Sequence, residues 1–149
     1  MADKALYFED VEEGMELPPL VKRPTAVALF RYSAVTWNPH RIHYDKEWAQ
    51  YEGYPAVLVQ AHLHGAYLTQ MVMDWIGPGG VLRKLSWSNR RFALPGDALT
   101  CKGRVTRKHV ANGQHYVECD IWEENQDGEV CAPGTALVSL PSRASREPA

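Results

Sequence analysis

The spacing of apolar residues changes along the chain, from a helical period to the alternating period of strands. The longest apolar stretch covers residues 55–77. Its large apolar side chains recur every four residues, at Leu63, Tyr67, Met71 and Trp75. This spacing places them on one side of a helix, so it predicts a largely buried central helix that ends at the glycine-rich segment 77–80.

Shorter elements are expected before the central helix. Residues 25–36 carry apolar side chains at helical spacing, which predicts a short helix. Asp45 is a favourable N-cap for a second short helix, which Gly53 ends. The preceding segment, 8–25, contains a Pro-Pro pair and predicts an extended lead-in with one short edge strand.

Beyond residue 80, apolar and polar positions alternate, which predicts strands. Asn-Gly at 112–113 and Asp-Gly at 127–128 predict hairpin turns, and Pro-Gly-Asp at 95–97 predicts a further turn. The turns delimit four expected strands, at 81–94, 98–109, 114–125 and 129–140. One buried helix followed by antiparallel strands predicts an α+β fold, in which a long sheet wraps around the central helix.

The composition is typical of one globular domain. The chain has 149 residues, of which 45% are hydrophobic and 23% charged, and its formal net charge is −2. We therefore expect one domain over residues 1–140 and a disordered tail over 141–149, with no nucleic-acid or membrane partner. The acidic N-terminus lacks an apolar signal core, so a cytoplasmic location is expected. The cysteines are expected to be reduced packing residues: Cys101, Cys119 and Cys131.

Residues 36–45, TWNPHRIHYD, form the densest cluster of residues able to do chemistry. His40 and His43 lie three positions apart, with Asn38 and Asp45 beside them. Three interpretations are open: acid–base chemistry, a metal site, or helix capping with hydrogen-bonded side chains. The metal interpretation is the weaker chemical one, because the segment lacks the helical HExxH pattern, and no metal or cofactor is expected.

The cluster and its place before the central helix resemble the signature of the MaoC-like dehydratases. These form the (R)-specific enoyl-thioester hydratase superfamily, and their fold is the hot-dog fold. Their signature reads Ser-Gly-Asp-x-Asn-Pro-Ile/Leu-His-x-Asp. This chain replaces the catalytic aspartate with Asn38 and the Asn-Pro pair with His40-Arg41. The positions that it keeps are Ile42, His43 and Asp45.

Longer stretches resemble one branch of that superfamily, the type 2 hydroxyacyl-thioester dehydratases and the mesaconyl-C4-CoA hydratases. The likeness spans residues 29–110. It is carried by RYSAVTWNPHRIHYD at 31–45, EGYPAVLV at 52–59 and SNRRFALPGDALT at 88–100. Residues 58–75 also resemble short actinobacterial MaoC chains, which form half of a two-chain hydratase, as in steroid side-chain degradation.

The resemblance implies a hydro-lyase that reversibly adds water to a 2-enoyl thioester of CoA or acyl carrier protein. This reaction needs a group that takes a proton from water, a group that protonates C2, and hydrogen-bond donors at the thioester oxygen. His43 is the expected acid–base residue, with Asn38 or His40 holding the water. The expected oxyanion donor is the backbone N–H of Ala61 or His62, at the start of the central helix.

Other residues of this region have both functional and structural interpretations. Arg41 either reaches a CoA phosphate or pairs with Asp45, whose better role is the N-cap. Gln60 precedes Ala61 where the family has His-Gly, so it is counted among the expected substrate-binding residues. His64 either lines the pocket or packs in the core.

Two further functions stay open. Asn38, Ala61 and the lack of the second hot-dog unit that is common in the branch also fit a non-catalytic subunit of a two-chain hydratase. A thioesterase is a weaker alternative, because the central helix has no Asp or Glu before Asp74. Hot-dog domains pair their sheets, so we expect a homodimer or a heterodimer with another hot-dog chain. Tryptophans such as Trp37 are expected in the core or at that interface.

Overall fold

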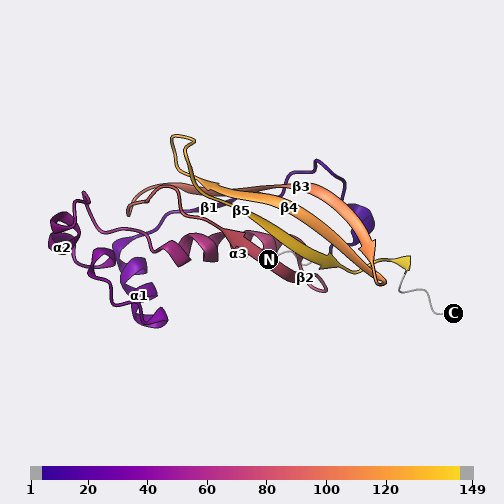
Figure 1. Ribbon diagram of the computed structural model, residues 1–149, viewed down its shortest axis with the longest axis horizontal. Coiled ribbons are helices and arrows are strands. Elements are labelled where there is room, and N and C mark those ends of the chain that lie inside the picture. The colour runs from indigo at the N-terminus through magenta and orange to yellow at the C-terminus, as the bar shows by residue number, and fades with distance from the viewer. Residues whose placement is uncertain (1–4, 145–149) are drawn as a thin grey trace.

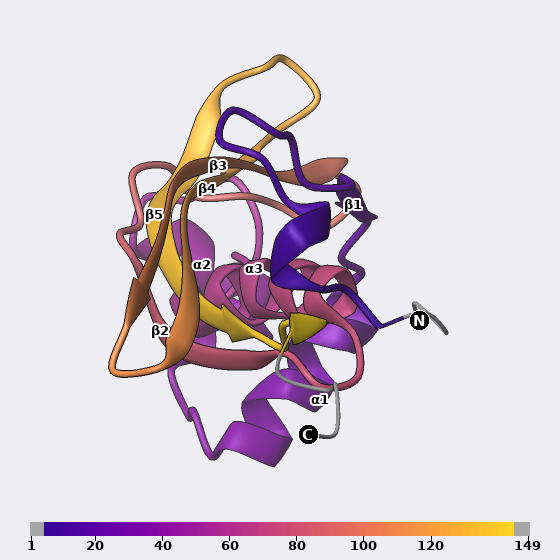
Figure 2. The ribbon, with the colours of Figure 1, turned by 90° about the vertical axis from the view of Figure 1, so that its right-hand side faces the viewer.

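The computed structural model describes residues 5–144 and shows one antiparallel sheet curled over one long helix (Figures 1 and 2). The long helix is α3, Ala61–Ile76. The sheet has five strands in the order β1-β3-β4-β5-β2. These strands are β1 Leu20–Lys22, β2 Val81–Trp87, β3 Leu99–Ala111, β4 Gln114–Glu124 and β5 Val130–Leu140. The predicted α+β hot-dog arrangement is confirmed.

The short helices α1 and α2 lie together at one end of the sheet (Figure 1). They are α1 Ala26–Thr36 and α2 Lys46–Tyr51, and the 3-10 turns are η1 Phe8–Asp10 and η2 Arg41–His43. Thr25 caps α1, and the Asp45 side chain caps α2 by accepting a hydrogen bond from Trp48 N at 3.1 Å. The predicted N-cap is thus confirmed, and it fixes where α2 begins, directly after residues 36–45.

The core forms where the inward side chains of the sheet meet the buried face of α3. In β4 every second residue points inward, so Val117, Cys119 and Ile121 are buried while the residues between them are more exposed. Burying these apolar faces against each other stabilises both layers, because neither face is satisfied in water alone. The buried residues that α3 contributes to this core are Leu68, Met71, Val72, Trp75 and Ile76.

The central helix is shorter than the apolar pattern predicts, because it begins at Ala61 and not at residue 55. The preceding residues run extended and bond to neighbouring segments. Leu58 N donates to Ile42 O, and Val59 N donates to Ala93 O, each at 2.9 Å. A continuous apolar run has the same pattern in a buried extended segment and in a buried helix. The residue pattern also does not mark where β2 ends: the strand stops at Trp87, although the alternation predicted a strand to residue 94.

The three cysteines are packed in the core, and the two ends of the described chain are bonded to each other. All three cysteines are free and buried, as predicted. Ser142 hydrogen-bonds the Glu9 carboxylate at 2.5 Å, and Arg143 pairs with Asp10 at 2.7 Å. The rest of the predicted disordered tail, residues 145–149, lies outside the described residues. Among the helices of residues 5–144, none has the length and apolar character needed to cross a membrane.

The close approach of β2 and β5 makes Gly134 a sensitive position. A Cβ atom there would lie 2.2 Å from Ser86 O and 3.1 Å from Trp87 Cα. We expect Gly134→Ala to lower the free energy of unfolding by about 1–3 kcal/mol, because the strands must separate to admit the methyl group. Urea unfolding followed by fluorescence measures this change. The exposed neighbour Ser88→Ala is the control, with an expected change within about 0.5 kcal/mol. Equal stability of Gly134→Ala and wild type would contradict the prediction.

Candidate active site

Residues of the 36–45 cluster line a cavity beside the start of α3. The cavity has a volume of about 450 Å³, within the usual range of small-molecule sites. Its walls come from the turn after α1, from η2, from the extended segment before α3, from the first turn of α3, and from the segment after β2. The predicted site residues that it brings together are Asn38, His40, His43, Ala61 and His62.

His43 is buried at the end of η2 and has one ring nitrogen engaged. It is 7% exposed, and its Nδ1 lies 2.9 Å from Leu58 O. The carbonyl can only accept, so Nδ1 carries the proton and Nε2 keeps its lone pair when the ring is neutral. Burial lowers the pKa of His43; the bond to Leu58 acts the other way, and nearby His40 adds to the lowering. Within residues 5–144 no hydrogen bond engages Nε2, so His43 can accept a proton there at neutral pH.

Asn38 and His40 lie beside His43 but have partners of their own. Asn38 follows Trp37, which ends α1 in the left-handed conformation at φ 54°. Asn38 Oδ1 accepts a hydrogen bond from His40 N at 3.2 Å, which leaves its amide NH₂ for other partners. The His40 ring lies 5.9 Å from the His43 ring, centroid to centroid, and its Nε2 is 3.2 Å from Glu52 Oε1. The hydrogen bond from His40 is also the main cause of the lowered pKa of Glu52.

The first turn of α3 presents backbone donors to the cavity. The N–H groups of Leu63 and His64 donate to Gln60 O, at 2.9 and 3.3 Å. In the described part of the chain, the N–H groups of Ala61 and His62 have no acceptor, as expected at a helix N-terminus. Both residues line the cavity. The helix dipole favours negative charge at this place, so the two N–H groups can stabilise an oxyanion.

Two predicted substrate-binding residues lie outside the cavity wall. Arg41 Nε donates to Asp45 Oδ2 at 3.0 Å, and its guanidinium lies 4.3 Å from the centre of the Trp48 ring. Gln60 is fully buried, and its Nε2 donates to Leu29 O at 2.7 Å and to Ser33 Oγ at 2.9 Å. Arg41 was expected either to reach a CoA phosphate or to pair with Asp45, and in the structure it pairs with Asp45. Gln60 joins the start of α3 to α1.

Sequence reasoning missed Glu123, a carboxylate on the inner face of the sheet. Glu123 is 0% exposed and its Oε1 accepts a hydrogen bond from Nδ1 of His64, which is 1% exposed and lines the cavity. The alternation of β4 contains the signal: Glu123 is two residues after the inward-facing Ile121. A carboxylate buried this deeply needs a partner, because removing a charge from water costs several kcal/mol. The pair is therefore a candidate functional group.

No three His, Cys, Asp or Glu side chains of residues 5–144 are grouped so that they could hold a metal ion. Two residues of the metal hypothesis face other partners, because His40 contacts Glu52 and Asp45 contacts Arg41. The arrangement is therefore one of hydrogen-bonded side chains around a cavity.

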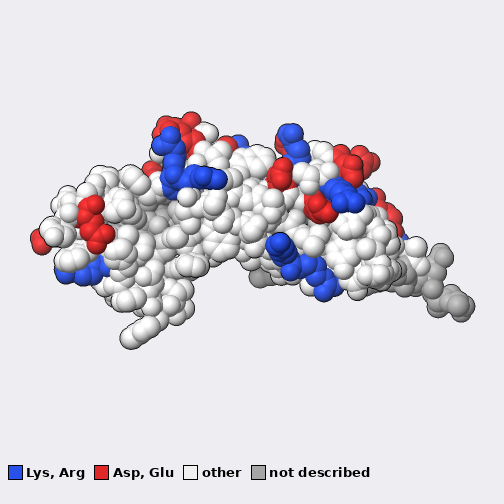
Figure 3. All heavy atoms as spheres, viewed as in Figure 1, with Lys and Arg blue, Asp and Glu red and all other residues white. Residues whose placement is uncertain are grey.

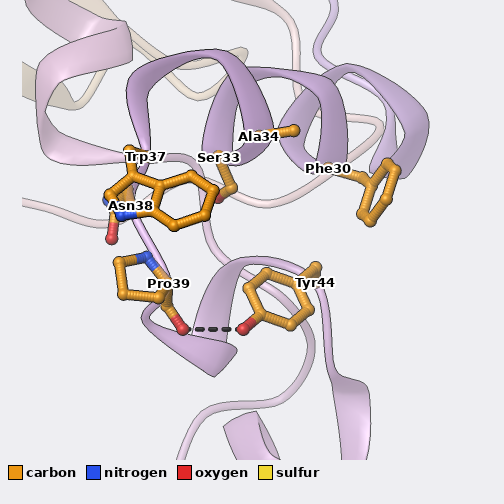
Figure 4. A pocket seen from close by; sticks show the side chains of 7 residues that line it. All are labelled: Phe30, Ser33, Ala34, Trp37, Asn38, Pro39 and Tyr44. Carbon is orange, nitrogen blue, oxygen red and sulfur yellow. Dashed lines mark hydrogen bonds between the residues drawn. The ribbon is translucent and has the colours of Figure 1, made fainter.

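A second hollow, of about 310 Å³, lies on the α1 side of the same turn (Figure 4). Trp37 and Tyr44 flank it, and Tyr44 Oη donates to Pro39 O at 2.6 Å. Its wall is mainly apolar, and Trp37 is 88% exposed. An aromatic side chain held open to solvent in this way is typical of a surface that another molecule covers.

Comparison with known proteins connects this site to one family. Residues 18–97 match the family model of hydroxyacyl-thioester dehydratase type 2. Mesaconyl-C(4)-CoA hydratase of Chloroflexus aurantiacus is 43% identical, in a match covering 40% of this chain and 22% of that protein. The mitochondrial hydroxyacyl-thioester dehydratase type 2 of Saccharomyces cerevisiae is 32% identical, over 51% of this chain and 27% of that protein. The chain spans about a quarter of the length of these curated relatives.

Solved structures share the fold at low sequence identity. The (R)-hydratase PhaJ1 of Pseudomonas aeruginosa superposes with a TM-score of 0.84 at 20% identity, covering 93% of this chain and 88% of that one. A chain of the ChsH1–ChsH2 complex of Mycobacterium tuberculosis gives 0.76 at 20% identity, with 87% and 98% covered. These likenesses confirm the fold.

The burial of His43 predicts how it titrates. We expect its pKa to lie below 6.5, because burial disfavours the charged ring. An NMR titration of the imidazole signals measures the midpoint, with His43→Gln used to assign the resonance. In the unfolded chain the ring takes up a proton nearer its ordinary pKa. The contribution of His43 to stability is therefore complete above pH 6.5 and falls as the pH drops toward the folded pKa. A midpoint at or above 6.5 would show that the ring is not desolvated.

Proposed function

Because the chain belongs to the hydroxyacyl-thioester dehydratase type 2 family, we propose that it reversibly adds water to a 2-enoyl thioester. The observation that carries the proposal is the state of His43. Its Nδ1 is held 2.9 Å from Leu58 O, and its Nε2 is left without a partner within residues 5–144. The cavity that it lines also presents the N–H groups of Ala61 and His62. A base and oxyanion donors in one cavity are what the reaction needs.

In the proposed reaction, the thioester oxygen accepts hydrogen bonds from Ala61 N and His62 N. These donors stabilise the enolate charge that develops when water attacks C3. His43 Nε2 takes the proton from the attacking water, and the lowered pKa of His43 keeps the ring neutral and ready to do so. Asn38 holds the water through its amide NH₂, because its carbonyl is occupied by His40 N. The reverse sequence dehydrates a 3-hydroxyacyl thioester.

The arginines at the cavity suit a phosphate-bearing carrier. Arg90 and Arg91 line the wall, and Arg91 also pairs with Glu129 at 3.0 Å. Guanidinium groups bind phosphate through charge-assisted hydrogen bonds. CoA and the phosphopantetheine arm of acyl carrier protein both supply such a phosphate, so the proposed substrate is a thioester of either carrier.

A specific observation also favours the alternative of a non-catalytic subunit. Asn38 stands where the MaoC-like superfamily signature has its catalytic aspartate, and an amide transfers no proton. One structural relative, the ChsH1–ChsH2 complex, contains two different chains. In this alternative the chain shapes the acyl pocket, and a sister hot-dog chain supplies the catalytic groups.

We expect purified protein to remove the enoyl-thioester absorbance of crotonyl-CoA or of a bulkier enoyl-CoA. His43→Ala should lower kcat by about 10²–10⁴-fold, the usual contribution of a general acid–base residue. His109→Ala is the matched control, because His109 is on β3, outside the cavity wall, and pairs with Glu118. An active wild type with equal rates for His43→Ala would remove His43 from the mechanism.

The same assay separates the two functions. Activity that appears only on mixing with a sister hot-dog chain, and that survives His43→Ala, identifies this chain as the non-catalytic subunit. Activity of the mixture that His43→Ala abolishes assigns the catalytic base to this chain.

We also propose that a second hot-dog domain, a copy of this chain or a sister chain, covers the outer face of α1. That face is mainly apolar and open: Val35 is 86% and Trp37 88% exposed, Val27 and Phe30 are also exposed, and the charged residue exposed beside them is Arg31. Figure 3 shows that the surface over α1 carries no charged side chain on the side in view. Open apolar patches of this kind on a domain are typical of protein interfaces. Trp37 would be an anchor, since tryptophan is enriched at interface hot spots.

The interface proposal predicts the effect of Trp37→Gly. Glycine adopts φ 54° without strain, so the turn should keep its shape while the exposed indole is lost. We expect the variant to become monomeric, or to lose binding to the sister chain, at protein concentrations where wild type associates. Light scattering after size exclusion measures this. Val110→Ser, which removes an exposed apolar side chain from β3, should leave association unchanged. Persistent association of Trp37→Gly would place the interface elsewhere.

A further inference from the structure

We propose that His64, held by the buried carboxylate of Glu123, is the second acid–base residue of this site and delivers the proton to C2. The inference rests on the proposed hydration reaction and completes its proton balance. That reaction moves two protons, one from water and one to C2. His43 takes the first. Asn38, at the position of the superfamily's aspartate, can neither give nor take the second.

The His64–Glu123 pair combines deep burial with access to the cavity. Its two side chains are 1% and 0% exposed, and Nδ1 of the ring donates to Glu123 Oε1. No hydrogen bond in residues 5–144 engages the other ring nitrogen, Nε2. Nε2 keeps some exposure, because the buried side-chain atoms without a hydrogen bond in residues 5–144 are Gln60 Oε1 and His109 Nδ1. Since His64 lines the cavity, Nε2 is the atom that opens onto it.

The position of His64 on α3 brings its ring toward the oxyanion donors. His64 follows Ala61 by three residues, so the two share one face of the helix. Helical side chains lean toward the N-terminus of their helix, which turns the His64 ring toward the first turn. A thioester whose oxygen is bound at Ala61 N and His62 N therefore has its C2 and C3 next to the part of the cavity that His64 lines.

Other titratable side chains lie around the His64–Glu123 pair. Cys101 Sγ lies 3.9 Å from Glu123 Oε2, so the second carboxylate oxygen is also engaged. Burial, and to a smaller extent the Glu123 carboxylate, raises the pKa of Cys131 to about 11, so this thiol stays protonated. Burial and the same carboxylate also raise the pKa of Tyr67, a residue of α3 whose ring lies 5.7 Å from Lys22 Nζ of β1. These thiol and phenol groups therefore hold their protons, which leaves the His64 ring as the group assigned to the proton transfer.

The other two cavity histidines are held differently. His40 is exposed and bonded to Glu52, and His62 is exposed with its ring edge-on to Trp87 at 6.2 Å. His43 and His64 are buried, and the Nδ1–H of each has a fixed acceptor. The acceptor of His43 is the neutral carbonyl of Leu58, and that of His64 is the carboxylate of Glu123. A carbonyl partner suits a neutral imidazole ring that accepts a proton, whereas a carboxylate forms an ion pair with a ring that carries a proton on both nitrogens. The surroundings of His43 therefore suit a base, and those of His64 suit an acid.

The proposed step moves one proton to His43 and one from His64. The water oxygen forms its bond to C3 while its proton passes to His43 Nε2. The C2–C3 π electrons move toward the thioester, and C2 then takes the proton of His64 Nε2. His64 is left neutral on the Glu123 carboxylate, and His43 is left protonated. The proton returns from His43 to His64 through water in the cavity that both line.

The test measures rate against pH for wild type, His64→Gln and Glu123→Gln. We expect His64→Gln to lower kcat by about 10²–10⁴-fold with KM little changed, and to remove the fall in rate on the alkaline side. Glu123→Gln should retain more activity than His64→Gln and should move that fall to lower pH, because the protonated ring loses its ion-pair partner. His109→Gln is the control, because His109 lies on β3 outside the cavity wall, 3.5 Å from Glu118, and it should leave the profile unchanged.

A purely structural pair would lower stability and leave the shape of the pH profile intact, and that result would overturn the proposal. The double variant His64→Leu/Glu123→Leu covers the case in which a single variant unfolds, because apolar replacement of a whole buried pair is often tolerated. A folded double variant with wild-type kcat would also overturn it. Either result, with an active wild type, leaves the proposed hydration standing. Wild type that hydrates no enoyl thioester, alone or with a sister chain, would instead remove the proposed function and this step together.

Discussion

The anchoring of Gln60, the N-cap residue of α3, is the constraint on which the rest of the site depends. Gln60 is buried between α1 and α3, and its side chain binds Leu29 O and Ser33 Oγ while its carbonyl accepts from Leu63 N and His64 N. These bonds set where the helix begins. They also leave the N–H groups of the next two residues open to the cavity. An unanchored helix end would fray by a turn, and the oxyanion donors would be lost with it.

The site concentrates polar groups in a place where burial makes each of them costly. His43 gives up favourable hydration of its charged form, and its lowered pKa is the physical result. The His64–Glu123 pair is buried more deeply, inside the contact between α3 and β4, where a hydrophobic pair would pack more easily. Both features lie around one cavity. The simplest physical account is that the fold tolerates these costs because electrostatic interactions are strongest where water is excluded.

Departures from the MaoC-like superfamily signature are concentrated in one turn and have connected consequences. Trp37 takes the place of a glycine at φ 54°, so the conformation that favours glycine is kept while a large indole is presented to solvent. The next residue, Asn38, keeps the shape of an aspartate but cannot carry a proton. The turn therefore has a conformation that suits the signature's glycine, with a different surface and a different chemistry. Under the proposals above, the surface serves a partner domain, and the proton chemistry is shared by two histidines on separate elements.

What the sequence determined by itself was local. The order of one helix and then antiparallel strands, the cap at Asp45 and the cluster around His43 follow from spacing and residue type, which act between neighbours in the chain. The apolar pattern alone did not give the start of α3, and the partners of Arg41, Gln60 and His64 were decided only in the tertiary structure. Each depends on a contact with a segment far away or on a competition between possible partners. Glu123 lies 59 residues from His64, and no local pattern can encode which buried side chain meets another across the core.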